Sequence, residues 1–165
     1  MRSSALAALA AAAACSGLAA AQSSAQRAAA LLAKMTLADK IGMLHGVGSP
    51  GYTGMTTANA ALGIPSLTLN DGRQGFRPND GAHTQTAFPC QLAAVATFDV
   101  DLMRQFGQAM GAEFNGKGAN VVLAPMLILA RLDRYGCNFE SIGEDPELAH
   151  AMAFALSRAC NPSAA

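Results

Sequence analysis

The stretch that decides the fold is residues 66–72, which read Ser-Leu-Thr-Leu-Asn-Asp-Gly. Its apolar and partly β-branched first half predicts a short buried strand over residues 66–69, and the polar turn residues Asn70-Asp71-Gly72 end that strand. A polar side chain at the carboxyl end of a parallel strand stands where α/β folds place their chemistry. The loop that follows runs from Asp71 to about Phe88, and loops of that length are often functional.

Upstream of this strand, the pattern is helical and then rich in helix breakers. Residues 22–34 have the high helix propensity of alanine, leucine and lysine. A second helix is predicted to open at Thr36 and Asp39, which resemble a capping box, and to end at Gly46. Residues 46–60 are predicted to form a loop. They lack the Gly-Lys-Ser/Thr ending of a phosphate-binding loop, so we assign them no nucleotide role.

Downstream, two further helices and one strand are predicted. Asp99 is suited to cap a helix that runs to about Gly116, and residues 120–125 are typical of a second buried strand. Asp145 is suited to cap a last helix that has proline at its first position. The first of these helices has an apolar face with residues spaced by three or four: Leu102, Phe106, Ala109, Met110 and Phe114. The order strand, loop, helix, strand, loop, helix predicts a parallel α/β fold.

The N-terminus resembles a targeting segment. Arg2 is a short positive region, residues 5–14 are apolar, and Ala19-Ala20-Ala21 forms a small-residue cleavage site. This order is typical of a secretory signal peptide, and we expect an extracellular protein. A plastid transit peptide is the alternative, because the alanine and serine content would suit one too. The apolar run is shorter than the roughly 20 residues needed to span a bilayer.

Composition and charge exclude several classes of function. The chain has 165 residues, which predicts one domain. Its 11 basic and 11 acidic residues cancel, so no net field favours nucleic acid or an anionic membrane as a partner. Three cysteines follow residue 21, and this odd number indicates no disulfide scaffold. Without a Cys-x-x-C pair or closely spaced histidines, we expect no metal site, and nothing suggests a cofactor.

Four stretches, in order across residues 35–150, form a more specific pattern. They are residues 35–42 (MTLADKIG), residues 64–77 (IPSLTLNDGRQGFR), four short motifs within residues 86–121 (TAFP, AVATFD, GAEF and KGANV) and residues 138–146 (NFESIGEDP). Together they resemble the N-terminal barrel domain of glycoside hydrolase family 3, which includes many β-glucosidases and β-xylosidases.

This resemblance implies a fold and an organisation. The implied fold is α/β, a partial TIM-type (β/α)8 barrel with parallel strands and flanking helices, incomplete because a whole barrel takes about 250 residues. The implied segments are a signal peptide at 1–21, the N-terminal part of the barrel domain at 22–156 and a divergent tail at 157–165.

The resemblance also implies an activity and a substrate. The family hydrolyses terminal non-reducing β-D-glucosyl or β-xylosyl residues with retention of configuration, which requires two carboxylates roughly 5 Å apart. The family motifs that carry the nucleophile and the acid/base do not occur in these residues, so no catalytic residue is assigned. The implied partner is a β-linked oligosaccharide or glucoside. The sequence does not address the oligomeric state.

Four residues match positions around the family's sugar pocket. Asp71 matches an aspartate that accepts hydrogen bonds from sugar hydroxyls, and Arg77 matches an arginine that holds a hydroxyl or the aspartate itself. Arg131 and Glu140 match residues expected to support the pocket wall through an ion pair or backbone hydrogen bonds.

Two residues depart from the family pattern. Cys137 stands where the family has an arginine that reaches the substrate, and a thiol cannot donate hydrogen bonds in that way. Arg73 stands where the family has proline, which predicts a looser turn after Asp71.

Three hypotheses follow for the polypeptide. It is the leading piece of a secreted β-glucosidase-type hydrolase, a non-catalytic relic that binds sugar or another chain, or a fragment that unfolds readily and has no activity. The last has a physical basis, because a partial barrel leaves a strand edge unpaired.

Overall fold

A computed structural model describes residues 22–78, 81 and 84–161 of the chain. The chain divides into two units, residues 1–37 and residues 38–165, and each is described by itself. The first unit contains α2 (Ser24–Lys34), which confirms the helix expected there. The Ser23 and Gln26 side chains each accept from the other's backbone N–H and so cap its start. The expected signal peptide, residues 1–21, lies outside the described residues.

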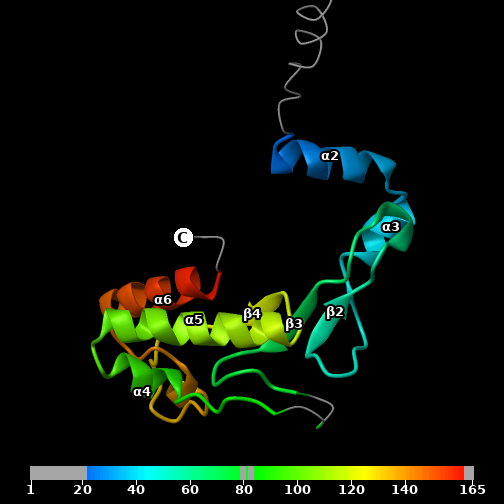
Figure 1. Ribbon diagram of the computed structural model, residues 1–165. Coiled ribbons are helices and arrows are strands. Elements are labelled where there is room, and N and C mark those ends of the chain that lie inside the picture. Colours follow the sequence, from blue (N-terminus) through cyan, green and yellow to red (C-terminus); the bar gives the residue numbers. More distant parts are fainter. Residues whose placement is uncertain (1–21, 79–80, 82–83, 162–165) are drawn as a thin grey trace, which may run out of the picture. The chain divides into compact units, whose positions relative to one another are not determined.

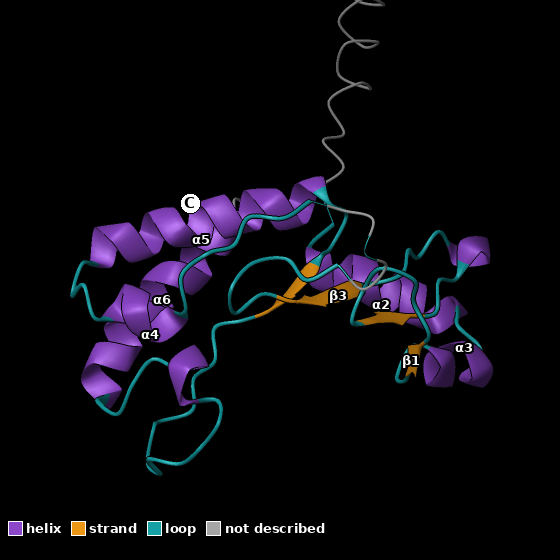
Figure 2. Cartoon of the chain, turned by 90° about the horizontal axis from the view of Figure 1, so that it is seen from below, coloured by secondary structure: helices purple, strands orange, loops and turns teal. Residues whose placement is uncertain are grey.

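The second unit is an α/β fold built on a mixed four-stranded sheet (Figure 2). Its strands lie in the order in which they occur in the sequence: β1 (Gly46–Val47), β2 (Gly54–Thr56), β3 (Thr68–Asp71) and β4 (Val121–Leu123). β3 and β4 are parallel, with Asp71 opposite Leu123, so this pair confirms the predicted parallel strands.

The expectation that residues 46–60 form a loop, and that all strands are parallel, is wrong. β1 and β2 lie within that stretch and pair antiparallel, and β2 in turn pairs antiparallel with β3. Gly51, at φ 88°, allows the chain to reverse between them. The edge of β3 that faces away from β4 needs partners for its backbone groups, and β2 supplies them, with Met55 opposite Thr68.

Helices make up the rest of the second unit. They are α3 (Leu37–Gly42), η1 (Ala60–Leu62), α4 (Gln91–Val95), α5 (Val100–Gly116), η2 (Asn138–Glu140) and α6 (Pro146–Cys160). Asp99 and Asp145 each accept two backbone N–H groups at the start of α5 and α6, as expected. α4 was not predicted, since five residues are too few for helical periodicity to show. α6 continues into residues 157–160. No described helix is long and apolar enough to cross a bilayer.

The core lies where α5 packs on α6, and Figure 1 shows the two helices side by side. Gly107 and Gly111 of α5 lie against the backbone carbonyls of Leu156 and Cys160, where a Cβ atom would overlap the carbonyl oxygen. The residue numbers of the two helices increase in the same direction along the contact, from Gly107 and Leu156 to Gly111 and Cys160. The helices are therefore parallel. This close approach is possible only because α5 presents glycines at the crossing.

Three of the five residues predicted for the apolar face of α5 are buried, and two are exposed. Phe106, Met110 and Phe114 are buried, but Leu102 is 40% exposed and Ala109 is also exposed. Met103, at 1% exposed, takes the place of Leu102 in the core. The close contact at Gly107 turns that side of the helix toward α6, and in the first turns Met103 rather than Leu102 is buried.

Aromatic packing fixes the loop that leaves β3. Phe76, 2% exposed, makes edge contacts with the rings of Tyr52 and Phe114. The ammonium of Lys117 lies 5.3 Å from the Phe76 ring centroid. Gly72 lies so close to Val122 of β4 that a Cβ atom would overlap that side chain. The residues after Asp71 are therefore held against β4 and the end of α5.

Candidate functional site

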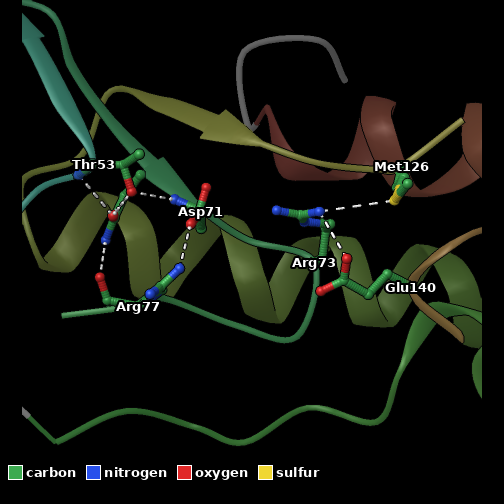
Figure 3. A network of polar contacts seen from close by, with 7 residues as sticks. Thr53, Asp71, Arg73, Arg77, Met126 and Glu140 are labelled. Carbon is green, nitrogen blue, oxygen red and sulfur yellow. Dashed lines mark hydrogen bonds and ion pairs between the residues drawn. The ribbon is translucent and has the colours of Figure 1, made fainter. Parts of the chain in front are cut away.

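Asp71 ends β3 and lies at the carboxyl edge of the parallel pair β3 and β4. Its side chain is 20% exposed, and Arg77 donates from Nη1 to Oδ2 over 3.1 Å (Figure 3). The Arg77 side chain itself is largely exposed. The structure therefore brings these two predicted site residues together, with a mostly covered carboxylate beside a largely exposed guanidinium.

Asn70 holds both partners of this pair in place. The side chain is fully buried, and its Oδ1 accepts from the Thr53 backbone N at 3.1 Å and from the Thr53 hydroxyl at 2.8 Å. Its Nδ2 donates to the backbone carbonyl of Arg77 over 2.8 Å. Because Asn70 adjoins Asp71 in the chain, one buried amide fixes the backbone at both ends of the Asp71–Arg77 contact.

Sequence reasoning did not identify Asn70 or Thr53 as site residues. Asn70 was expected only as a residue that ends the strand, and Thr53 lies in the stretch expected to be a loop. The signal that could have identified Asn70 is its position near the end of an otherwise apolar strand. An amide side chain buried there needs hydrogen-bond partners, and these partners hold neighbouring segments in place. Thr53 carried no such signal, because its contact depends on the unpredicted pairing of β2 with β3.

A second ion pair lies at the same edge of the sheet. Arg73 donates from Nη1 to Oε2 of Glu140 over 2.7 Å, and the same nitrogen lies 3.8 Å from the sulfur of Met126 (Figure 3). The Arg73 side chain is thus anchored across the site to η2, and the looser turn expected after Asp71 stays a prediction. Its exposed fraction is 32%, and that of Glu140 is 17%.

The structure does not pair the two residues expected to support the pocket wall. Glu140 contacts Arg73 rather than Arg131. Arg131 is exposed and, among the described residues, makes no ion pair. It lines a separate pocket of about 420 Å³ with four other residues: Ile128, Leu129, Leu132 and Tyr135. Cys137 is half-buried and precedes the first turn of η2.

The arrangement is suited to binding hydroxyl groups. Each carboxylate can accept hydrogen bonds from hydroxyls through oxygens that its arginine leaves uncovered, and each guanidinium carries further donors. Among the residues that the structure describes, no three histidine, cysteine or acidic side chains are grouped to hold a metal ion. A groove of about 760 Å³ along α5 and α6 contains none of the predicted site residues.

A family model matches most of the chain. The model described as the glycosyl hydrolase family 3 N terminal domain matches residues 50–161. Probable beta-glucosidase F of Aspergillus flavus is 39% identical over 129 residues, which cover 76% of this chain and 14% of that protein. Beta-glucosidase 2 of Saccharomycopsis fibuligera is 40% identical over 131 residues, covering 77% of this chain and 14% of that protein.

Solved structures are similar over the same part of the chain. Beta-glucosidase 3B from Thermotoga neapolitana, solved in complex with glucose, superposes with a TM-score of 0.75 at 32% identity, over 80% of this chain and 21% of that one. A beta-glucosidase from Streptomyces venezuelae, solved with D-glucose, gives a TM-score of 0.76 at 34% identity, over 81% of this chain and 17% of that one. The chain thus spans about a fifth or less of the proteins that it resembles.

Proposed function

The chain belongs to glycosyl hydrolase family 3, and from that membership we propose that it forms the sugar-binding part of a β-glucosidase-type hydrolase. Its substrate is a glycoside with a terminal β-linked glucosyl residue, with a β-xylosyl residue as the alternative. Asp71 accepts hydrogen bonds from hydroxyls of that terminal sugar, and Arg77 holds the carboxylate in position.

The observation that carries the proposal is the Asp71–Arg77 contact at the carboxyl end of β3. A carboxylate can accept from two neighbouring hydroxyls at once, and the charge strengthens both hydrogen bonds. Asn70 fixes the backbone on both sides of the contact, so the carboxylate is oriented before any sugar arrives. Such preorganisation reduces the entropy lost when the ligand binds.

In this proposal, β3, α5, β4 and α6 are successive units of a (β/α)8 barrel. Two observations support it: β3 and β4 are parallel and adjacent, and α5 and α6 run in the same direction side by side. Functional groups of such barrels lie at the carboxyl ends of the strands, where Asp71 is found.

We further propose that these residues by themselves bind sugar without hydrolysing it. Hydrolysis with retention requires a free carboxylate as nucleophile and a second carboxyl group as acid/base, roughly 5 Å apart. At this edge of the sheet, Asp71 and Glu140 each contact an arginine, which suits a binding role.

Calorimetric titration of the full chain with methyl β-D-glucoside tests the proposal. Binding is expected with the wild-type chain and is expected to be lost in Asp71→Asn, which keeps the shape of the side chain but removes its charge. Asp101→Asn is the matched control, because Asp101 pairs with Arg104 on the exposed face of α5. Equal heats from Asp71→Asn and the wild type would refute the sugar role of Asp71. In parallel, p-nitrophenyl β-D-glucoside should not be hydrolysed by any of the three proteins.

A further inference from the structure

The second ion pair, Arg73 with Glu140, carries an inference beyond the role of Asp71. Both side chains are partly covered, and the donor–acceptor distance of 2.7 Å is that of a strong charge-assisted hydrogen bond. The surface pair of Arg104 with Asp101, by contrast, lies on one turn of a helix with both side chains largely exposed. The Arg73–Glu140 pair instead joins two segments that lie 67 residues apart in the sequence.

Partly buried neighbours, one of them bonded to a buried amide, hold Arg73 in its position. The guanidinium contacts the sulfur of Met126, and the backbone N–H of Met126 donates to Oε1 of Gln91 over 2.9 Å. Gln91 is fully buried at the start of α4. A chain of contacts therefore runs from a buried amide, through Met126, to the guanidinium, and fixes one side of it while Glu140 fixes another.

The rest of the guanidinium is available to a ligand. Both contacts that Arg73 makes with described residues come from Nη1, so Nε and Nη2 keep their donors for other groups. Arg73 follows Asp71 by two residues, and Figure 3 shows its guanidinium between Asp71 and Glu140.

We propose that Arg73 and Glu140 form a specificity-determining pair that donates to a hydroxyl of the same uncharged glycoside that Asp71 binds. This inference rests on the proposed function. Glu140 neutralises the guanidinium, so the pair offers donors and an acceptor without net charge and selects a neutral sugar. A glycoside with a carboxylate, such as a glucuronide, is disfavoured because Glu140 already occupies the cation and repels a second anion.

The test measures the affinities of methyl β-D-glucoside and methyl β-D-glucuronide for the full chain by titration calorimetry. Arg73→Met removes the donors and is expected to weaken glucoside binding by about tenfold or more. Glu140→Gln keeps the shape but frees the positive charge, and is expected to shift the glucuronide-to-glucoside affinity ratio toward glucuronide by on the order of tenfold. Arg104→Met and Asp101→Asn, the matched changes in the exposed pair on α5, should leave both affinities unchanged.

The outcomes separate this inference from the proposed function. If the wild type binds glucoside and Asp71→Asn does not, but Arg73→Met binds as the wild type does, the pair has no role in binding and only this inference fails. If the wild type binds neither sugar, both proposals fail. If Arg73→Met does not fold, the affinity ratio of Glu140→Gln decides, because a purely structural ion pair would not change the preference between two ligands. An unchanged ratio overturns the inference.

Discussion

Replacing Asn70 with alanine is expected to destabilise the second unit and to disorder the site at once. The Asn70 side chain makes three hydrogen bonds, two with Thr53 and one with the carbonyl of Arg77. A buried hydrogen bond contributes about 1 kcal/mol net, so the loss in the free energy of unfolding should be about 3 kcal/mol. For a domain of this size, that corresponds to a fall in Tm of roughly 6–12 °C.

The assay is urea unfolding followed by circular dichroism at 222 nm, which reports on helix content, and α5 and α6 are the two longest described helices. Thr53→Val removes a hydroxyl that donates to Asn70 and accepts from the backbone N–H of Asp71, and should cost about 2 kcal/mol. The double variant should lose about 1 kcal/mol less free energy of unfolding than the sum of the two single losses. The reason is that the Thr53 hydroxyl and Asn70 share one hydrogen bond, which either substitution removes.

Asn59→Ala is the matched control. Asn59 is also an asparagine of the second unit, but it is only half-buried, and its side chain accepts one backbone N–H, from Leu62, the last residue of η1. Its loss should cost about 1 kcal/mol. If Asn70→Ala costs no more than Asn59→Ala, then Asn70 does not organise the end of β3, and the reasoning that makes it the support of the Asp71–Arg77 contact is refuted.

Two further expectations concern α5 and α6. Gly107→Ala places a methyl group against the carbonyl of Leu156 and should destabilise the protein by about 1–3 kcal/mol. Gly116→Ala places its methyl group in open space and should be neutral or stabilise by up to about 1 kcal/mol. Equal changes in Tm for the two variants would contradict the close packing of α5 on α6. Burial raises the pKa of the Cys160 thiol to about 11. The unfolded thiol ionises near its usual value of about 8.5, so the free energy of unfolding should fall as pH rises from about 8.5 to 11. Urea midpoints across that range should show a smaller decline in Cys160→Ala.

Helices and strands could be predicted from the sequence where a capping or turn residue adjoins a run of apolar residues that must be buried. Asp99 and Asp145 each precede a run with helical periodicity, and each caps a helix in the structure. β3 and β4 were recognisable because both are short apolar runs bounded by polar or glycine residues. Asp71 could be placed at a strand end from the sequence alone, because the residues after it are turn formers.

The rest depended on contacts between distant segments, which periodicity does not report. β1 and β2 are short and contain glycine, so only their pairing with β3 makes them strands. Arg73 and Glu140 could not be paired by inspection, because nothing local in either segment marks the other as its partner. The same is true of the burial of Met103 in place of Leu102, which depends on how α5 packs against α6.

The most direct test of the sugar site is a titration of the isotope-labelled chain with methyl β-D-glucoside, followed by amide chemical shifts. We expect the shift changes to concentrate at Asn70, Asp71, Arg73 and Arg77, around the carboxyl end of β3. Shifts that instead gather along the groove between α5 and α6, at Phe154 and Arg158, or an absence of shifts at any sugar concentration tested, would contradict this expectation.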